Sequence, residues 1–534
     1  MIRHSIDHLV LREGQLFAYG WGFFPGSEIV SVELHLDFGS EAQPIKIKAE
    51  YGRQRDDVTA SFPDVPEARN AGFLLLAGFV QKKIMRASLH WELKDQRVVD
   101  TLIDLSQING EAVTQSLSSR YKYLFWKSIT VLRSSGVGAL IRKARRSFPI
   151  QIRPHDESEW GILCAKLRGQ LLAVVVDHDM GGGANIYRNL YVTERCAKGE
   201  TVLLLGFHVN SLQYFVDVFH GRSSHRHIIG SPEDILFLAS HGKVQHLVYN
   251  CAVSFRQPLA VINMLEALKK RNSGCQLIVM VHDYFVICPS HFLIDSKGKF
   301  CDIPDKNYCQ DCLQKHRDGF VSLGGTKDIS LWRNSWFKLL SIADEVRMFS
   351  ESSKRLLKKA YPSLNDAVLS IVPHALPLKM SNVRLAAGHH LHIGIVGSIG
   401  VHKGANIVRD LASVIAQSNS NAKITVIGTI DVQVCDEVVT VTGPYETKQL
   451  AQIIKKFGVN IFLFPSIVSE TFSYVAHELA AMNVPFACFD IGAPADLART
   501  YEGGLVLSSM EPNKTLHDLE RFWHKTYQIT EKRV

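Results

Sequence analysis

The pattern of hydrophobic and polar residues divides the chain into a short first part and a longer second part. Over residues 1–110, runs such as IVSVELHLDF (29–38) and ASLHWEL (87–93) alternate apolar and polar positions, with Gly, Pro and Asp between the runs. Alternation with a period of two is typical of strands that bury one face. We therefore expect a small sandwich-like β module at residues 1–110.

From residue 171 onward, continuous apolar runs alternate with helical stretches. The first set of apolar runs is LLAVVVDHD, TVLLLGF, HLVYNCAV and QLIVMVHDY. The second set is DEVRMFS, AVLSIVP, LHIGIVGS, AKITVIGT, VNIFLFPS and VPFACFD. Such runs are typical of buried parallel strands. They predict an α/β fold in which two Rossmann-like domains face a cleft.

The same pattern gives expected boundaries. The first Rossmann-like domain is expected at residues 161–335 and the second at 336–512, with a crossover near 314–343 and a C-terminal helix at 513–534. With 534 residues, 46% of them hydrophobic and 21% charged, the chain is folded and too long for one core.

The charge is concentrated in one segment. The net charge is +8, and residues 114–150 contain eight basic residues and no acidic one: Arg120, Lys122, Lys127, Arg133, Arg142, Lys143, Arg145 and Arg146. The rest of the chain is therefore balanced, so we do not expect a nucleic-acid partner. The segment, within a predicted linker at 111–160, is either an amphipathic helix on an anionic membrane surface or a solvated helix packed on a neighbour.

Targeting signals are not evident. The opening residues MIRHSIDHLVLREG lack the apolar stretch of a signal peptide. The longest apolar run, AGFLLLAGFV, is about half of the ~18 residues that a spanning helix needs. We expect a cytoplasmic protein that can contact the inner face of the membrane. Its ten cysteines are therefore expected to be thiols or metal ligands.

A first glycine-rich loop, VVVDHDMGGGANIYRNL, places Gly181, Gly182 and Gly183 between a strand and a helix. Glycines allow close approach of a ligand, and a helix N-terminus offers free N–H groups to an anion. A nicotinamide site would also need an acidic residue at the end of the next strand. That strand ends LLLGFHVN, which disfavours a dehydrogenase. A tight turn without a ligand is the alternative.

A second loop, HIGIVGSIGVHKGANIVRDL, contains Gly397, Gly400 and Gly404, with Lys403 where a helix begins. A lysine there can place its charge on a phosphate held by backbone amides. The loop lacks the GK[ST] order of a Walker A motif.

Two glutamates follow in PSIVSETFSYVAHELAAMNVPF (465–486), namely Glu470 and Glu478. If a helix begins near Phe472, eight positions advance ~12 Å and rotate ~80°, so both carboxylates can face one cleft. Between them lie the free amides of Phe472, Ser473 and Tyr474. A sugar nucleotide, with a diphosphate between two hydroxyl-rich groups, matches this arrangement. The alternative is that Glu470 caps the helix and Glu478 is solvated.

Together, the three glycines, Lys403-Gly404 and Glu470-x7-Glu478 resemble family 4 of the retaining glycosyltransferases, which have the GT-B fold. The resemblance covers about residues 171–510, and GAPAD (492–496) stands where that family has a glycine-rich donor-side loop. The N-terminal stretches GRQRDDV and AGF resemble an accessory module found ahead of some bacterial glycosyltransferases.

The resemblance implies roles for matching positions. Glu470 would hold hydroxyls of the donor sugar, and Glu478 would hold the nucleotide ribose. Lys403 would carry the diphosphate, together with the amides of Phe472 to Tyr474 and the loop at Gly182. His282, after the strand LIVMV, would lie against the transferred sugar.

The resemblance further implies transfer from a nucleotide sugar with retained configuration, without a catalytic metal or a protein nucleophile. The acceptor would be a glycan or a lipid-linked oligosaccharide, in bacterial surface-polysaccharide synthesis. One departure is Ser398, where family members often have an arginine; His402 is a candidate replacement cation. The alternatives are another GT-B enzyme, such as a sugar-nucleotide epimerase, and a non-catalytic carbohydrate-binding or scaffold protein.

A cysteine cluster lies directly after His282. Cys288, Cys301, Cys309 and Cys312 have the spacing C-x12-C-x7-C-x2-C. Four cysteines this close together predict a structural zinc site with four thiolates. Free thiols or a redox pair are the alternatives, and His291 and His316 are possible substitute ligands.

Overall fold

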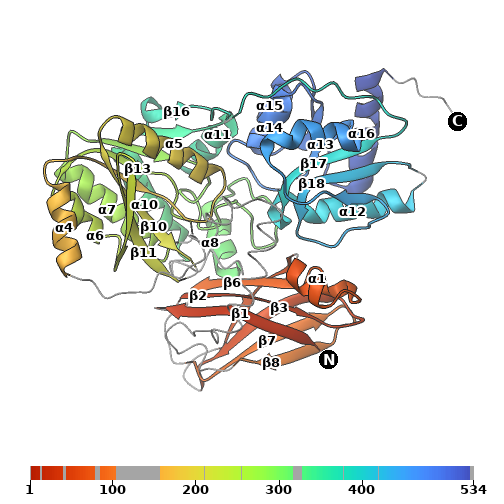
Figure 1. Ribbon diagram of the computed structural model, residues 1–534, viewed down its shortest axis with the longest axis horizontal. Helices are drawn as coiled ribbons and strands as arrows, with labels where there is room; N and C mark the ends of the chain where they lie inside the picture. Colours follow the sequence, from red (N-terminus) through yellow and green to blue (C-terminus); the bar gives the residue numbers. More distant parts are fainter. Residues whose placement is uncertain are drawn as a thin grey trace.

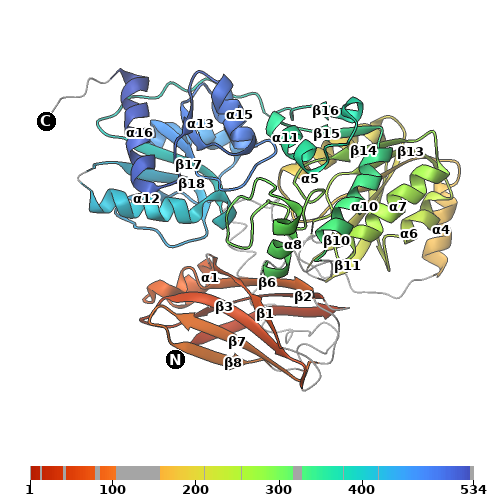
Figure 2. The same ribbon diagram turned by 180° about the vertical axis from the view of Figure 1, so that it is seen from behind.

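Three folded parts make up the computed structural model, a β module and two α/β lobes (Figures 1 and 2). The structure describes residues 2–528 except 13–14, 40–43, 54, 79–83, 104–156, 210, 254, 317–326, 377 and 419. The basic segment 114–150, for which we expect an amphipathic helix, thus lies outside the described residues. In the part of the chain that is described, no helix is long and apolar enough to cross a membrane.

The N-terminal module is a β-sandwich, as its alternating pattern predicts. One sheet has the order β1-β2-β6-β5 and the other the order β4-β3-β7-β8, and all pairs are antiparallel. The inward-facing positions, among them Leu34, Leu75 and Trp91, form a common core between the sheets. The elements are β1 (Arg3–Arg12), β2 (Gln15–Phe23), β3 (Ile29–Asp37), β4 (Ile45–Lys48), β5 (Glu50–Arg53), α1 (Asp56–Ser61), η2 (Pro66–Ala68), β6 (Gly72–Gly78), β7 (Arg86–Leu93) and β8 (Val98–Leu102).

The first lobe is an α/β layer structure built on one eight-stranded sheet. Its order is β12-β11-β10-β9-β13-β14-β15-β16, and its strands are parallel apart from the antiparallel pairs β10–β11 and β11–β12. Its strands are β9 (Leu171–Val176), β10 (Thr201–His208), β11 (Gln213–His220), β12 (Ser223–Ile229), β13 (Lys243–Tyr249), β14 (Gln276–Met280), β15 (Glu345–Met348) and β16 (Leu369–Ile371). Its helices are α4 (Glu157–Leu167), α5 (Gly183–Ala197), α6 (Asp234–Ala239), α7 (Pro258–Arg271), α8 (Lys306–Lys315), α10 (Ile329–Ile342), α11 (Glu351–Ala360) and η3 (Asp366–Val368).

The second lobe has a six-stranded sheet with the order β19-β18-β17-β20-β21-β22, parallel throughout. Its strands are β17 (His392–Ile399), β18 (Lys423–Ile430), β19 (Val439–Val441), β20 (Ile461–Phe464), β21 (Phe486–Phe489) and β22 (Gly504–Leu507). Its helices are η4 (Val401–Lys403), α12 (Ala405–Gln417), η5 (Thr447–Gln449), α13 (Leu450–Phe457), α14 (Tyr474–Ala481), α15 (Gly492–Thr500) and α16 (Pro512–Tyr527). The predicted fold class, two Rossmann-like domains behind a β module, is confirmed.

The boundary between the lobes differs from the expected one at residue 335. The runs DEVRMFS and AVLSIVP, assigned to the second domain, form β15 and β16, which pair in parallel with β14 and with each other. The first sheet therefore extends to Ile371, and the second begins at His392. Hydrophobic periodicity identifies a buried strand but does not say which strand it pairs with.

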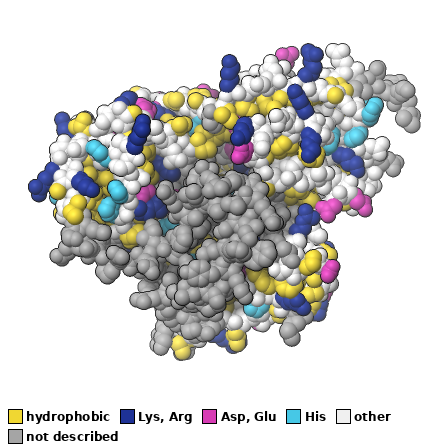
Figure 3. All heavy atoms as spheres, viewed as in Figure 1, with side chains coloured by type: hydrophobic (Ala, Val, Ile, Leu, Met, Phe, Trp, Pro, Cys, Tyr) yellow, Lys and Arg dark blue, Asp and Glu magenta, His cyan; other side chains and the backbone are white. Residues whose placement is uncertain are grey.

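The β module lies against both lobes rather than apart from them (Figures 1 and 2). Phe17 of β2 is 6% exposed and belongs to the hydrophobic core cluster of the first lobe. On the other side, Nη1 of Arg69 lies 3.5 Å from Oδ2 of Asp436 in the second lobe. On the face shown in Figure 3, the described Lys and Arg side chains are scattered over both lobes among hydrophobic and acidic ones.

Candidate active site

The predicted site residues of the two lobes come together at the carboxyl ends of both parallel sheets. A Cβ atom added to Gly183 would lie 3.0 Å from Cε2 of Tyr474 in the opposite lobe. The hydroxyl of Thr471 donates to the backbone oxygen of His282 at 2.9 Å. Gly183 therefore faces α14 across the cleft, where a side chain would fill the space between the lobes.

The glycine-rich loop of the first lobe is held by a buried polar network. Gly181 and Gly182 have φ angles of +86° and +89°, which glycine adopts without strain. The N–H of Gly181 donates to Oδ1 of Asn185 at 2.6 Å, and Nδ2 of Asn185 donates to Oδ2 of Asp177 at 2.6 Å. Arg188 lies 3.3 Å from the same carboxylate oxygen. Burial raises the pKa of Asp177, so this network fixes the loop at some electrostatic cost.

Asp177, Asn185 and Arg188 were missed by the sequence analysis. The sequence could have indicated them, because they flank the three glycines. The end of a strand and the first turns of the following helix bring these positions together. Asp177, His178 and Cys251 also place ligand atoms within 4.8 Å of one another. Each of the three already has a protein partner: Asn185 donates to Asp177, Met180 N donates to Nδ1 of His178, and the thiol of Cys251 lies 2.8 Å from Oδ2 of Asp283. We therefore assign this group to holding the loop.

The loop that carries Lys403 packs directly on the loop of the paired glutamates. Gly404 has a φ angle of +86°, and a Cβ atom there would lie 1.9 Å from the backbone oxygen of Pro465. The Lys403 side chain is half-buried, and among the described residues its ammonium group has no hydrogen-bond or ion-pair partner. A half-buried cation without a partner is available to an anionic ligand.

The surroundings of Ser398 and His402 bear on the missing arginine. Ser398 accepts a hydrogen bond from Thr429 Oγ1 at 3.1 Å, just after Gly397, which has a φ angle of +121°. The imidazole of His402 stacks on the ring of Phe292 with a centroid distance of 4.7 Å. Burial, and then the neighbouring charge of Lys403, lower the pKa of His402 to about 4. His402 is therefore neutral at pH 7 in the unliganded protein, which disfavours it as the cation that replaces the arginine.

The stretch with the glutamates begins its helix slightly later than expected, at Tyr474 instead of near Phe472. Ser473, the residue before the helix, has a φ angle of +69° and makes no side-chain cap. The N–H groups of Phe472 and Ser473 donate to no other group among the described residues. The first N–H groups of a helix have no partner within it, so a row of donors faces the cleft here.

Glu470 lies in the loop before these donors. Its backbone oxygen accepts from the N–H of Ala493 at 2.8 Å, in the GAPAD stretch. The GAPAD stretch, expected as a loop, forms the first turns of α15. A Cβ atom on Gly492 would lie 2.7 Å from the backbone nitrogen of Glu470, so the start of this helix supports the glutamate closely. Within the described part of the chain, the Glu470 carboxylate has no ion pair, and the capping role considered as an alternative is not observed.

Glu478, in the second turn of α14, is 5% exposed. Burial raises the pKa of its carboxyl group to about 7. No hydrogen bond or ion pair to this carboxylate is found among the described residues. The alternative that Glu478 is solvated is therefore wrong. A desolvated carboxylate without a partner is suited to accept hydrogen bonds from a pair of hydroxyl groups.

His282 forms part of the first-lobe wall. Its Nε2 atom lies 2.9 Å from Oδ1 of Asn250, and Nδ2 of Asn250 donates to the backbone oxygen of Ala184 at 3.1 Å. Oδ1 therefore accepts, the proton is on Nε2 and the Nδ1 lone pair is free. The ring stacks on Phe349, and burial lowers the pKa of His282 well below its usual value. His282 is thus a neutral hydrogen-bond acceptor.

The four cysteines of the predicted zinc site gather beside α8. Burial, with smaller contributions from the neighbouring thiols, raises the pKa of Cys288 to about 12 and that of Cys301 to about 11. Arg333 Nη2 donates to Cys309 Sγ at 3.4 Å, and Ser296 N donates to Cys312 Sγ at 3.3 Å. Among the described residues, no three of these sulfur atoms lie within 4.8 Å of one another. Four cysteines are nevertheless a usual ligand set of structural zinc, so the residues present fit such an ion in their chemistry.

Comparisons with known proteins bear on the second lobe most directly. Residues 390–524 match the family described as glycosyl transferases group 1, which supports glycosyl transfer as the reaction class. No curated protein sequence matches the chain.

Several solved structures resemble the chain at low identity. The lipopolysaccharide outer core galactosyltransferase WaaB, in its apo form, is 13% identical over 67% of this chain and 91% of its own, with a TM-score of 0.38. HepE of Anabaena, solved with UDP and glucose, is 12% identical over 67% and 91%, with a TM-score of 0.40. The pneumococcal O-GlcNAc transferase GtfA, solved with UDP and GlcNAc, is 10% identical over 59% and 60%, with a TM-score of 0.34.

Proposed function

We propose that this protein is a retaining glycosyltransferase that moves a sugar from a nucleotide-sugar donor to a glycan or lipid-linked acceptor. The observation that carries the proposal is the set of unpaired groups in one cleft. Glu470, Glu478 and Lys403 have no charged partner among the described residues, and unpaired N–H groups lie between the two glutamates. Burying unpaired charged groups costs free energy, and a bound ligand of complementary charge offsets that cost.

In this proposal each group binds one part of the donor. Glu478 accepts hydrogen bonds from the ribose hydroxyls, and Glu470 accepts them from hydroxyls of the transferred sugar. Lys403 and the N–H groups of Phe472 to Tyr474 hold the diphosphate, with the glycine loop at Gly181 to Gly183 opposite.

The chemistry follows from where charge develops. As the bond between the anomeric carbon and the diphosphate breaks, negative charge grows on the leaving phosphate. Lys403 and the preorganised N–H donors stabilise that charge without reorganising. His282, neutral and with a free Nδ1 lone pair, accepts a hydrogen bond from the sugar rather than neutralising its developing positive charge.

A zinc ion held by Cys288, Cys301, Cys309 and Cys312 is part of this proposal as a structural element. Phe292, between the first two cysteines, stacks on His402 of the second lobe. A zinc ion would therefore rigidify the segment through which the first lobe touches the donor-side loop. Assembly of bacterial surface polysaccharides remains the proposed setting, with the basic linker near the membrane.

A second candidate function, a carbohydrate-binding scaffold without turnover, is favoured by Ser398, where a cation on the phosphates is absent. Slow hydrolysis of the donor separates the two. The purified protein is incubated with UDP-, GDP-, ADP- and dTDP-linked α-sugars, and the released sugar is followed by NMR. The proposal predicts release that appears first as the α anomer, from one nucleotide class. Initial β anomer would contradict retention, and binding without hydrolysis would favour the scaffold.

A further inference from the structure

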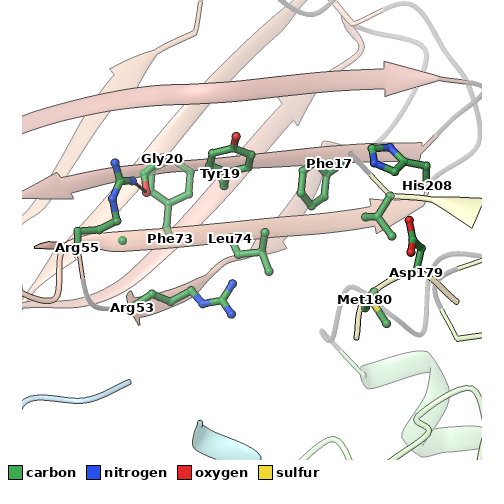
Figure 4. A pocket seen from close by; sticks show the side chains of 12 residues that line it. Phe17, Tyr19, Gly20, Arg53, Arg55, Phe73, Leu74, Asp179, Met180 and His208 are labelled. Carbon is green, nitrogen blue, oxygen red and sulfur yellow. Dashed lines mark hydrogen bonds between the residues drawn. The ribbon is translucent and has the colours of Figure 1, made fainter. Parts of the chain in front are cut away.

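A cavity lies between the β module and the first lobe, beside the donor cleft. Its volume is about 550 Å³, which is in the range of small-molecule sites. Strands β2, β5 and β6 of the module form one wall, and the segments at Met180 and His208 of the first lobe form the other (Figure 4). Met180 directly precedes the glycine loop, so the cavity opens next to the predicted diphosphate site.

The module wall is apolar and aromatic. Phe17, Tyr19, Phe73 and Leu74 line it. The ring of Tyr19 is held by stacking on His8, with a centroid distance of 5.4 Å. Rigid aromatic and aliphatic surface with a few polar groups is typical of pockets that bind a ring-shaped ligand.

Three of the polar groups in the cavity already have protein partners. Arg55 Nη1 donates to Asp7 Oδ2 at 2.8 Å, and Asp179 Oδ2 lies 3.6 Å from Arg226. His208 Nδ1 lies 3.0 Å from the hydroxyl of Ser211. Burial lowers the pKa of His208, so it is neutral at pH 7. These groups shape the cavity and leave it little charge.

Arg53 is different. Its side chain is exposed, and among the described residues it makes no hydrogen bond and no ion pair. In Figure 4 it extends beside Leu74 in the direction of Met180. A guanidinium group without a partner, at the edge of an aromatic pocket, presents a planar set of donors that matches a phosphate or a carboxylate.

Arg53 also lies near the donor loops of the second lobe. The preceding residue, Gly52, is so close that a Cβ atom there would lie 3.3 Å from the backbone oxygen of Asp431. The Arg53 charge lowers the pKa of both Asp431 and His402, and the Glu470 charge raises the pKa of His402. A ligand that contacts Arg53 from the cavity therefore extends toward the predicted position of the transferred sugar.

We propose that this cavity is the acceptor site, that it binds a carbohydrate carrying an anionic group, and that Arg53 of the β module binds that group. The assignment of the cavity to the acceptor rests on the proposed function. The anion is a phosphate, as in a sugar phosphate, or a carboxylate, as in a uronic acid. The β module then completes the enzyme, because one wall of the acceptor site belongs to it.

The test uses the full chain and four probes, glucose 1-phosphate, glucuronate, glucose and inorganic phosphate, in ligand-observed NMR titrations. Wild-type protein is expected to bind one or both anionic sugars at least tenfold more tightly than glucose or inorganic phosphate. Arg53→Gln should lose at least tenfold of that affinity. Arg97→Gln is the matched control, an exposed arginine of the same module that pairs with Asp95, and should retain it within twofold.

Competition separates this proposal from the donor site. The bound anionic sugar should persist in the presence of a saturating nucleoside diphosphate. Displacement by that nucleotide would place the anion in the donor site and overturn the proposal, as would equal affinity in Arg53→Gln or no binding of either anionic sugar. Preference for glucose 1-phosphate or for glucuronate identifies the anion.

If Arg53→Gln does not fold, Arg53→Lys replaces it in the titrations, with a smaller loss of affinity expected because lysine cannot bind bidentately. Nucleotide binding itself is measured separately, so failure of the donor-site proposal has its own readout.

Discussion

Replacing Glu478 by Gln should stabilise the unliganded protein and weaken its binding of a nucleotide. Folding raises the pKa of this carboxyl group from 4.5 to about 7 through burial. At about 1.4 kcal/mol per unit, keeping it ionised in the folded state costs about 3 kcal/mol at pH 8. Glutamine removes the charge and keeps the shape, although its buried amide loses about 1 kcal/mol when it is incompletely paired. The expected net gain is about 2 kcal/mol at pH 8.

The sign of this effect depends on pH. Because the folded-state pKa lies above the unfolded one, the group is neutral in both states below pH 4.5, and the cost is absent there. The cost grows between pH 4.5 and about 7 and is fully present above that range. The gain in Glu478→Gln should therefore be seen at pH 8 and vanish near pH 4.

Hydrogen exchange of peptides from α14 and β21 measures this free energy of opening in the second lobe by itself. Glu502→Gln is the control, because Glu502 is exposed on the same lobe. Equal protection of wild type and Glu478→Gln at pH 8, with unchanged structure, would refute the inference that the carboxylate is desolvated and unpaired. Nucleotide affinity should fall at least tenfold in the variant, since an amide replaces the acceptor for the ribose hydroxyls.

Three further predictions concern the donor loop, the glycine turn and the cysteines. Glu470→Gln should lower turnover at least tenfold in a donor-hydrolysis or transfer assay, and near-full activity would remove its role with the donor sugar. Gly404→Ala should lower the melting temperature and weaken nucleotide binding, because its Cβ would lie 1.9 Å from Pro465 O at a positive φ angle; Gly443→Ala, at a positive φ angle with open space around it, is the control for backbone strain alone. Metal analysis of the purified protein should find about one zinc ion per chain, and folded protein free of metal would disprove the four-thiolate site.

Much of the fold could be predicted because local patterns determine it. Continuous apolar runs identified the parallel strands, and alternating runs identified the β module. The glycine and glutamate motifs lie at strand–helix turns, and parallel strands bring such turns to one edge of a sheet. This is why Gly183 and Tyr474, 291 positions apart in the sequence, could be expected near one cleft.

What could not be predicted depends on contacts between distant segments. The lobe boundary was misplaced because β15 is assigned by its pairing with β14 and not by its own residues. The lowered pKa of His402 follows from burial first and then from the Lys403 charge, and its burial includes a contact with Phe292, more than a hundred residues earlier. Arg53 lies beside the donor loops only because the whole β module packs against the two lobes. No local sequence pattern predicts that packing.

The most direct test of the account is nucleotide binding in the interlobe cleft. Purified protein is heated with a panel of nucleoside diphosphates and nucleotide sugars, and the melting temperature is recorded. A ligand that binds only the folded state raises it. The account predicts a rise with one base, lost in both Lys403→Ala and Glu478→Ala. A folded protein whose melting temperature no nucleotide changes would contradict it.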